Sequence, residues 1–370
     1  MKKHLSLSLL FFVLLFVCGC WDAQDIEDFN VPLIAAYDLA KENGKEVRVT
    51  VLYPDVAQRN KELIEPVEGK TVGDTRSKRG TRFPSTLLLG HIQLALYGEK
   101  LAYQGLYSFI DNYVRNPRIK KSLYMAVVKG GSYEFLKEVH QNNQYLGFEL
   151  PKVFSSKKKN QFFAITTLYD FAHAVTTTGK NPVLPVLSAD KRKNYKIDGT
   201  AIFKKDKMIA IADMNETVPL ILLRGIERCC GHIPFIITKE GKQIDKGTVE
   251  IASQRKVYVE RKGDKFIFHI KLKINGRLVE HYTSERFLIK DANYIREVEK
   301  AVEEQIKRDC QKLILKMKEE WGVDCIDISR FALAKWRREL EDVIEDEDFI
   351  RNADIKVDAK VNIDCWGSGS

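Results

Sequence analysis

The sequence predicts an α+β protein: a mixed α/β chain of several subdomains, with an antiparallel sheet and a long amphipathic helix in its C-terminal half. Three observations support this prediction. Strand and helix patterns alternate in the first half, which is typical of an α/β unit. Strands in the second half alternate apolar and polar residues, which favours an antiparallel sheet with one solvated face. Apolar residues recur every three or four positions over residues 295–321, which predicts one long helix.

Length and composition set the broad class. A chain of 370 residues favours about two to three domains. Hydrophobic residues make up 44% and charged residues 30%, which is typical of a globular protein and excludes a disordered or fibrous one. Lysine and arginine total 60 against 51 acidic residues, a net charge of +9 with both signs interspersed. This charge does not indicate a nucleic-acid partner, and none is expected.

The N-terminal segment predicts a lipoprotein signal. Two lysines precede the apolar run 5–17, which as a helix is too short to cross the roughly 30 Å hydrocarbon core of a bilayer. The sequence Val17-Cys18-Gly19-Cys20 then has the form of a bacterial lipobox. We therefore expect residues 1–19 to be a signal peptide and Cys20 to carry the lipid on its sulfur. The alternative is an ordinary secretory signal with a coincidental cysteine.

Residues 20–196 are expected to form an N-terminal α/β domain. The helix predicted at 99–115 is expected to end at Asn116-Pro117, because the helical conformation is unfavourable for a residue that precedes proline. Ser132 is predicted to cap the helix that follows Gly130-Gly131. Residues 188–199 are polar, charged and without periodicity, so the domain boundary is placed there. The predicted strands are 46–53, 87–97 and 122–128, and the predicted helices are 55–64, 99–115, 132–139 and 161–174.

Residues 197–366 are expected to form a C-terminal α+β domain of one or two subdomains. A charged turn at 204–207 predicts a hairpin, and Asn215 is predicted to cap a helix that ends near residue 227. The long helix 295–321 ends at Gly322. Residues 355–365 alternate strictly and predict a strand that closes the antiparallel sheet. The other predicted elements are strands 200–203, 208–213, 247–251, 256–261 and 265–274 and a helix at 329–343.

No catalytic, cofactor or metal site is expected. Gly69-Lys70-Thr71 ends like a phosphate loop, but Ile64 stands where that motif needs glycine. Cys229-Cys230-Gly231-His232 has no second Cys/His pair nearby in the sequence, which favours a structural loop over a zinc site. The acidic segment 341–348 lacks the spacing and the glycine of a calcium loop. The sequence therefore predicts a protein that is not an enzyme.

Two further groups of residues have open interpretations. The basic residues either face anionic lipid headgroups beside the tether or supply ordinary solubilising charge; they are Arg76, Lys78, Arg79, Arg82 and Lys157 to Lys159. The remaining cysteines match no compact disulfide framework, so mostly reduced, buried thiols are expected. These cysteines are Cys229, Cys230, Cys310, Cys325 and Cys365.

Several motifs together resemble the Ger(x)C family, the lipoprotein C subunits of spore germinant receptors. The first is Cys20-Trp21-Asp22 with the acidic segment 25–28, and the similarity extends over the whole mature chain through residues 98–106, 115–117, 199–207, 321–324 and the closing strand. The resemblance implies a non-enzymatic subunit without cofactor or small-molecule ligand. It implies anchoring through Cys20 on the outer face of the spore inner membrane, and action with an A subunit and a permease-like B subunit.

A ligand-capturing lipoprotein of a transporter is the alternative function. Two-lobed capture proteins repeat βα units in both lobes. Residues 228–290 contain few helical patterns and predict antiparallel strands, which disfavours this alternative.

Overall fold

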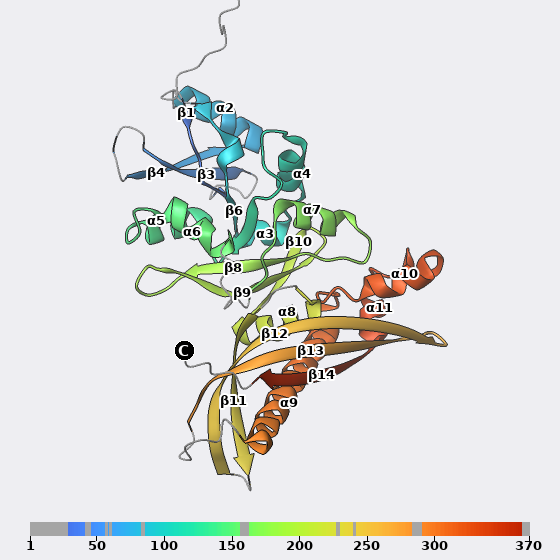
Figure 1. Cartoon of the computed structure of the whole chain (residues 1–370). Helices are drawn as coiled ribbons and strands as arrows, with labels where there is room; N and C mark the ends of the chain where they lie inside the picture. The colour runs from blue at the N-terminus through green and yellow to red at the C-terminus, as the bar shows by residue number, and fades with distance from the viewer. Residues whose placement is uncertain are drawn as a thin grey trace, which may run out of the picture.

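The computed structural model describes residues 29–40, 46–55, 58, 61–82, 86–155, 163–226, 230–239, 242–282 and 291–364. Within them the chain forms an eight-stranded sheet, a four-stranded sheet and a two-stranded pair, with helices packed on the two larger sheets (Figure 1). The predicted α+β class is therefore confirmed. Among the described helices, none is both long and apolar enough to cross a membrane.

The eight-stranded sheet comes mainly from the N-terminal half. It contains β2 (Ile34–Leu39), β3 (Val47–Pro54), β4 (Glu62–Gly69), β6 (Leu94–Gly98), β7 (Tyr124–Val128), β8 (Val183–Ala189), β9 (Tyr195–Lys204) and β10 (Lys207–Ala212). The order is β10-β9-β8-β7-β6-β2-β3-β4. The four central strands are parallel neighbours, and the outer pairs are antiparallel. The central strands are apolar runs because both faces of the sheet are covered.

Helices cover both faces of this sheet. The core on one face contains residues from α3 (Glu99–Gln104), α4 (Tyr107–Arg115) and α7 (Leu168–Thr176), and the core on the other contains residues from α5 (Ser132–His140) and α6 (Leu146–Ser155). At the end of the sheet formed by β3 and β4, α2 (Val72–Arg82) packs on both of these strands. Nearby in the chain, β1 (Phe29–Asn30) pairs with β5 (Thr86–Leu87), which the 3-10 turn η2 (Leu89–His91) follows.

Several predictions for this region are wrong or incomplete. The predicted helix 55–64 is wrong, because β4 begins at Glu62 and pairs with β3. The predicted strand 87–97 is divided into β5, η2 and β6. The predicted helix 99–115 is divided into α3 and α4 at Gly105, whose φ of 123° lies outside the range of an α-helix. The predicted helix 161–174 begins only at Leu168 in the described residues.

The start of α5 corrects another prediction. Ser132 does not cap this helix but is its first residue. Instead the carboxylate of Asp38, from β2, accepts hydrogen bonds from the backbone N–H groups of Ser132 and Tyr133 at 2.7 and 2.9 Å. A side chain distant in the sequence therefore satisfies the free N–H groups of the helix start.

The C-terminal part contains a four-stranded sheet and four α-helices among its described residues. Its elements are α8 (Met214–Arg224), β11 (Cys230–Lys239), β12 (Lys242–Lys262), β13 (Lys265–His281), α9 (Ala292–Lys316), the π-helical turn η4 (Met317–Trp321), α10 (Ser329–Leu340), α11 (Glu347–Asn352) and β14 (Asp354–Asp364). The sheet order is β11-β12-β13-β14. The two strands predicted at 247–251 and 256–261 are parts of one long strand, β12.

The long helix and the last strand are found where the sequence places them. The helix runs through α9 and η4 and ends at Gly322, which adopts the left-handed conformation (φ 60°). The prediction that the last strand pairs antiparallel is wrong, because β14 runs parallel to β13. The helices between these two strands carry the chain back across the sheet, as a crossover between parallel strands requires. Carboxylates of α9 occupy the outer edge of β14: Glu303 and Glu299 accept from the backbone N–H groups of Val361 and Ile363 at 2.9 and 2.8 Å.

The two sheets share an apolar core. The predicted boundary between residues 196 and 197 falls inside β9, which pairs with β8, so the first sheet extends to the end of β10. From there α8 enters the space between the sheets (Figure 1). Ile202 of β9, Leu220 of α8 and Leu313 of α9 all belong to one buried cluster. Helix α8 is thus the connection that positions the long helix relative to the first sheet.

Candidate functional site

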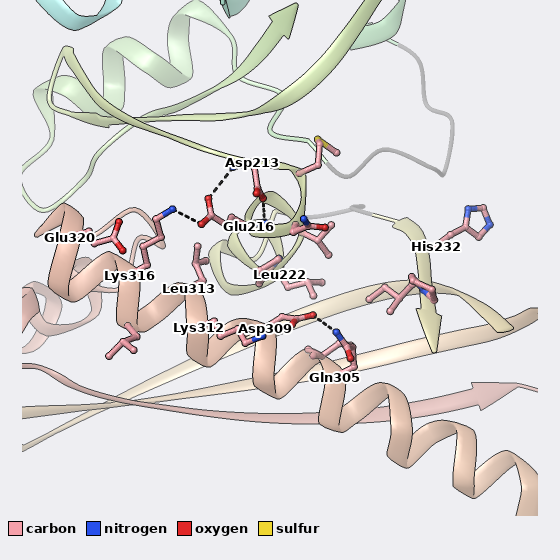
Figure 2. Close-up of a pocket in the computed structure, with 18 of the residues that line it drawn as sticks. Asp213, Glu216, Leu222, His232, Gln305, Asp309, Lys312, Leu313, Lys316 and Glu320 are labelled. Carbon is pink, nitrogen blue, oxygen red and sulfur yellow. Dashed lines mark hydrogen bonds and ion pairs between the residues drawn. The ribbon is translucent and has the colours of Figure 1, made fainter. Parts of the chain in front are cut away.

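A groove of about 940 Å³ lies between α8, β11 and the C-terminal half of α9 (Figure 2). Leu222 and Leu313 are buried on its floor, whereas Leu315 is 55% exposed. The groove is therefore an apolar surface open to solvent. Its apolar lining residues are Met214, Val218, Pro219, Leu222, Ile233, Pro234, Ile306, Leu313 and Leu315.

The start of α8 forms one end of this groove. Asp213, rather than the predicted Asn215, caps the helix. Its carboxylate accepts from the backbone N–H of Glu216 at 2.9 Å, and the Glu216 carboxylate accepts from the backbone N–H of Asp213 at 3.0 Å. This reciprocal arrangement is a capping box, which stabilises the first turn of a helix.

An ion pair joins α8 to α9 across the groove (Figure 2). The ammonium of Lys316 donates to the second oxygen of Glu216 at 2.5 Å, and it lies 5.3 Å from the centre of the Trp321 ring. The hydrogen bond to Glu216 raises the pKa of Lys316. Because its ordinary pKa is already far above neutral, Lys316 stays charged and serves as a fixed contact rather than a proton donor.

The rim of the groove carries excess negative charge. Five acidic side chains line it against two lysines, a net charge of −3 without His232. Gln305 donates to one of these acids, Asp309, at 2.8 Å (Figure 2). An apolar floor with an acidic rim suits an apolar segment flanked by basic side chains. The acidic residues are Asp213, Glu216, Asp309, Glu319 and Glu320, and the lysines are Lys312 and Lys316.

The structure brings few of the sequence-predicted site residues together. Cys20, with the signal peptide 1–19, lies outside the described residues, as does Cys229. His232 lies on β11 at the groove (Figure 2). Within the part of the chain that the structure describes, no group of three or more His, Cys, Asp or Glu side chains could hold a metal ion. Cys310 and Cys325 are free and buried, and burial raises the pKa of both thiols.

One of the motif residues that suggested the resemblance, Asp324, has a structural role. The buried carboxylate of Asp324, after η4, accepts from the backbone N–H groups of Ile326, Ile328 and Ser329 at 3.1, 2.8 and 2.7 Å. The groove was not predicted from the sequence. The pattern Asp213-x-x-Glu216 is a capping-box signal that could have placed the start of α8. The approach of residue 316 to residue 216 has no sequence signal.

The fold and the site define a two-sheet α+β protein whose candidate site is a binding surface. Residues 22–189 match the family described as "Spore germination protein N-terminal domain". Residues 198–367 match the family described as "Spore germination B3/ GerAC like, C-terminal". The chain belongs to the Ger(x)C family of spore germination proteins, as the resemblance predicts.

Curated relatives are similar along most of the chain. The "Putative spore germination protein YfkR" of Bacillus subtilis (strain 168) is 25% identical over 84% of this chain and 83% of its own length. "Spore germination protein B3" of the same organism is 25% identical over 89% of this chain and 88% of its own. "Spore germination protein GerQC" of Bacillus cereus is 20% identical over 94% and 97%.

A solved structure has the same fold. The chain of the "Crystal Structure of the GerBC protein" superimposes with a TM-score of 0.58 at 16% identity, over 89% of this chain and 96% of that one. Both sheets therefore belong to the shared architecture.

Proposed function

We propose that this chain is the membrane-anchored C subunit of a nutrient germinant receptor. In this proposal it is a non-enzymatic interaction component that acts with an A subunit and a permease-like B subunit. The observation that carries the proposal is the match of both halves of the chain to spore germination domains, with the three relatives above aligned over 83% to 97% of their own length. The diacylglycerol on Cys20 holds the protein on the outer face of the spore inner membrane.

The groove is the proposed contact for a partner subunit. Its occupant is an apolar polypeptide segment flanked by lysine or arginine, because the floor is apolar and the rim has a net charge of −3. Leu315 is the matching apolar anchor on this side, since more than half of its surface is exposed.

Co-isolation from spore membranes tests both statements. An affinity-tagged chain is expected to recover the A and B subunits. Leu315→Asp places a charge in the groove and should reduce that recovery strongly. Val279→Asp is the matched control, because Val279 is 50% exposed on β13 and does not line the groove. Equal recovery with both variants would exclude the groove as the contact, and no A or B subunit with the unmodified chain would exclude the receptor proposal.

The anchor has its own test. Cys20→Ser removes the sulfur that would carry the lipid, so the variant should be left unprocessed or released from membranes, and receptor function should fall. Cys18→Ser is the control and should behave like the unmodified chain. A Cys20→Ser protein that still fractionates with membranes at normal size would show that the lipobox interpretation is wrong.

The transporter alternative gains no support from the second half. The four-stranded sheet pairs antiparallel apart from β14, so among the described residues it does not repeat the parallel arrangement of the first half. Calorimetry against a panel of amino acids and sugars separates the two functions. Micromolar affinity for one nutrient, about −8 kcal/mol, would favour a capture protein, whereas millimolar or weaker binding supports a receptor component.

A further inference from the structure

A second hollow lies in the N-terminal part of the molecule. This cavity, of about 490 Å³ and open on one side to solvent, is bordered by β2, β3, α2, β5 with the segment 89–92 that follows it, and residues 113–118 at the end of α4. Apolar side chains form part of its walls, and they are Ala35, Val49, Val51, Val72, Leu87, Leu89 and Ile92. Such a lining with a few convergent polar groups is typical of a small-molecule site.

Arg79 is the most unusual group in this cavity. It is only 6% exposed, although α2 is otherwise a polar helix. One terminal nitrogen donates to the carbonyl oxygens of Val49 and Glu65 at 3.0 and 3.4 Å. Within the described residues the Nε atom has no hydrogen-bond partner and the guanidinium forms no ion pair. The carboxylate of Glu65 attracts it from further away, while one of its oxygens accepts from the Tyr53 hydroxyl.

A buried guanidinium without an anion in direct contact is costly, because two carbonyl oxygens and the more distant Glu65 carboxylate compensate only partly for its desolvation. The sequence left open whether Arg79 faces lipid headgroups or solvent. In the structure the Arg79 side chain is buried and lines the cavity of the N-terminal part, so it is not an ordinary solvent-exposed charge. An anion in that cavity would provide the missing partner.

Two tyrosines add polar hydroxyl groups to the lining of the cavity. The hydroxyls of Tyr37 and Tyr113 are hydrogen-bonded to each other, and both residues line the cavity. That bond uses one of their two hydroxyl hydrogens, so the other can donate to a ligand. Burial raises the pKa of Tyr37 to about 12, so its hydroxyl remains protonated.

The charge of the lining has one sign. Arg76 and Arg118 are exposed residues that also line the cavity, and no aspartate or glutamate is among its described lining residues. Three arginines with no acid attract an anion and would repel a cation.

We propose that this cavity binds an amphiphilic anion, a phosphate or carboxylate group attached to an apolar body. The anionic oxygens would accept from Arg79 and from the tyrosine pair, and the body would pack on the walls formed by β3 and the β5 region. The segment from Cys20 to Phe29 spans at most about 30 Å, so a lipid anchor would keep the cavity near the membrane. The anion could therefore be a lipid headgroup or a free amphiphile. The pocket itself goes beyond the proposed receptor function and does not depend on it.

Calorimetry on the full chain in nanodiscs of phosphatidylcholine tests the proposal with hexyl phosphate as the probe and hexanol as its uncharged counterpart. The unmodified chain should bind hexyl phosphate at least about tenfold more tightly than hexanol. Arg79→Met keeps an apolar side chain of similar length and should abolish this preference. Arg82→Met, at the exposed end of the same helix, should retain it. Arg76→Gln changes an exposed residue, cannot disturb the core, and should weaken hexyl phosphate binding severalfold.

The outcomes are decisive in both directions. Equal affinity for hexyl phosphate and hexanol, or unchanged binding in both Arg79→Met and Arg76→Gln, would overturn the proposal. Nanodiscs that contain phosphatidylglycerol identify the source of the anion. If they suppress the heat of hexyl phosphate binding, a lipid headgroup occupies the cavity; if the heat remains, the site takes a free amphiphilic anion. Because only the purified chain is present, these results are independent of whether the A and B subunits bind.

Discussion

The groove and the N-terminal cavity have similar apolar floors but opposite charge. The groove between α8, β11 and α9 carries a net charge of −3, whereas the cavity under α2 is lined by three arginines and, in the described residues, by no acid. The chain as a whole has a net charge of +9 with both signs interspersed. The difference shows that the sign of each hollow is set by which distant residues the fold assembles, not by the composition.

The two hollows also rest on different sheets. Helix α9 is supported by the four-stranded sheet, while the cavity uses β2 and β3 of the eight-stranded sheet. We therefore expect substitutions to affect one hollow and spare the other, although the shared core through α8 connects the two parts.

The largest expected effect comes from Val361→Asp in β14. Val361 is 3% exposed and belongs to the core beneath α9. Loss of its burial together with burial of a carboxylate should reduce the free energy of unfolding by about 3 kcal/mol or more. Denaturant unfolding of the chain from residue 21 measures this change, and Asn362→Asp on the exposed face of the same strand is the control.

Below the melting transition, hexyl phosphate binding to the N-terminal cavity of the Val361→Asp variant should remain. An unchanged stability would contradict the placement of β14, and loss of hexyl phosphate binding would break the separation of the two hollows.

A smaller effect with a pH dependence is expected from Glu62→Gln in the N-terminal part. Glu62 is buried in β4, and desolvation raises its pKa from 4.5 to about 7 although it accepts from the backbone N–H of Gly147. The folded state therefore holds the proton more strongly than the unfolded state. The contribution that protonated Glu62 makes to the free energy of unfolding is therefore lost as the pH rises from 4.5 through about 7. Glutamine cannot ionise, so Glu62→Gln should be more stable than the unmodified chain by up to about 3 kcal/mol above pH 8 and nearly equal to it in acid.

Urea unfolding at several pH values measures this difference, with the exposed Glu304→Gln on α9 as the control. His140 acts in the opposite direction on the acid side, because burial lowers the pKa of its imidazole, whose Nε2 lies 3.6 Å from Glu62. A gain in stability that is the same at every pH would show that Glu62 ionises normally in the folded chain.

The contrast between the two parts also explains what the sequence could predict. Strand β14 and helix α9 bury one face only, so their patterns have clear periods of two and 3.6, and both were located correctly. The central strand β6 is buried on both faces and has no alternation, so the largely apolar segment 87–97 was predicted as one strand although it contains the turn η2. Strand β4 depends on pairing with β3, which propensity alone does not encode.

The candidate sites were less predictable than the elements. Arg79 lies in a helix rich in basic residues, and nothing in the local pattern distinguishes it from exposed Arg82. Its burial arises because α2 packs on β3, where the Val49 carbonyl accepts from it. In the same way the groove needs residue 216 and residue 316 side by side, a contact that only the tertiary fold creates.

The smallest expected effect on stability sharpens the comparison most. Lys316→Met and Lys312→Met both change the net charge of the groove from −3 to −4, but only Lys316→Met removes the ion pair with Glu216. Because that pair is partly exposed, its loss should cost less than about 1 kcal/mol. Lys312→Met should leave the stability unchanged.

If the groove selects its occupant by charge, both variants should bind an amphipathic peptide of leucine and lysine more tightly than the unmodified chain. The gain should shrink at high salt, and a leucine–glutamate peptide should show none. A gain seen only for Lys316→Met would mean that release of Glu216, rather than the charge of the rim, governs binding.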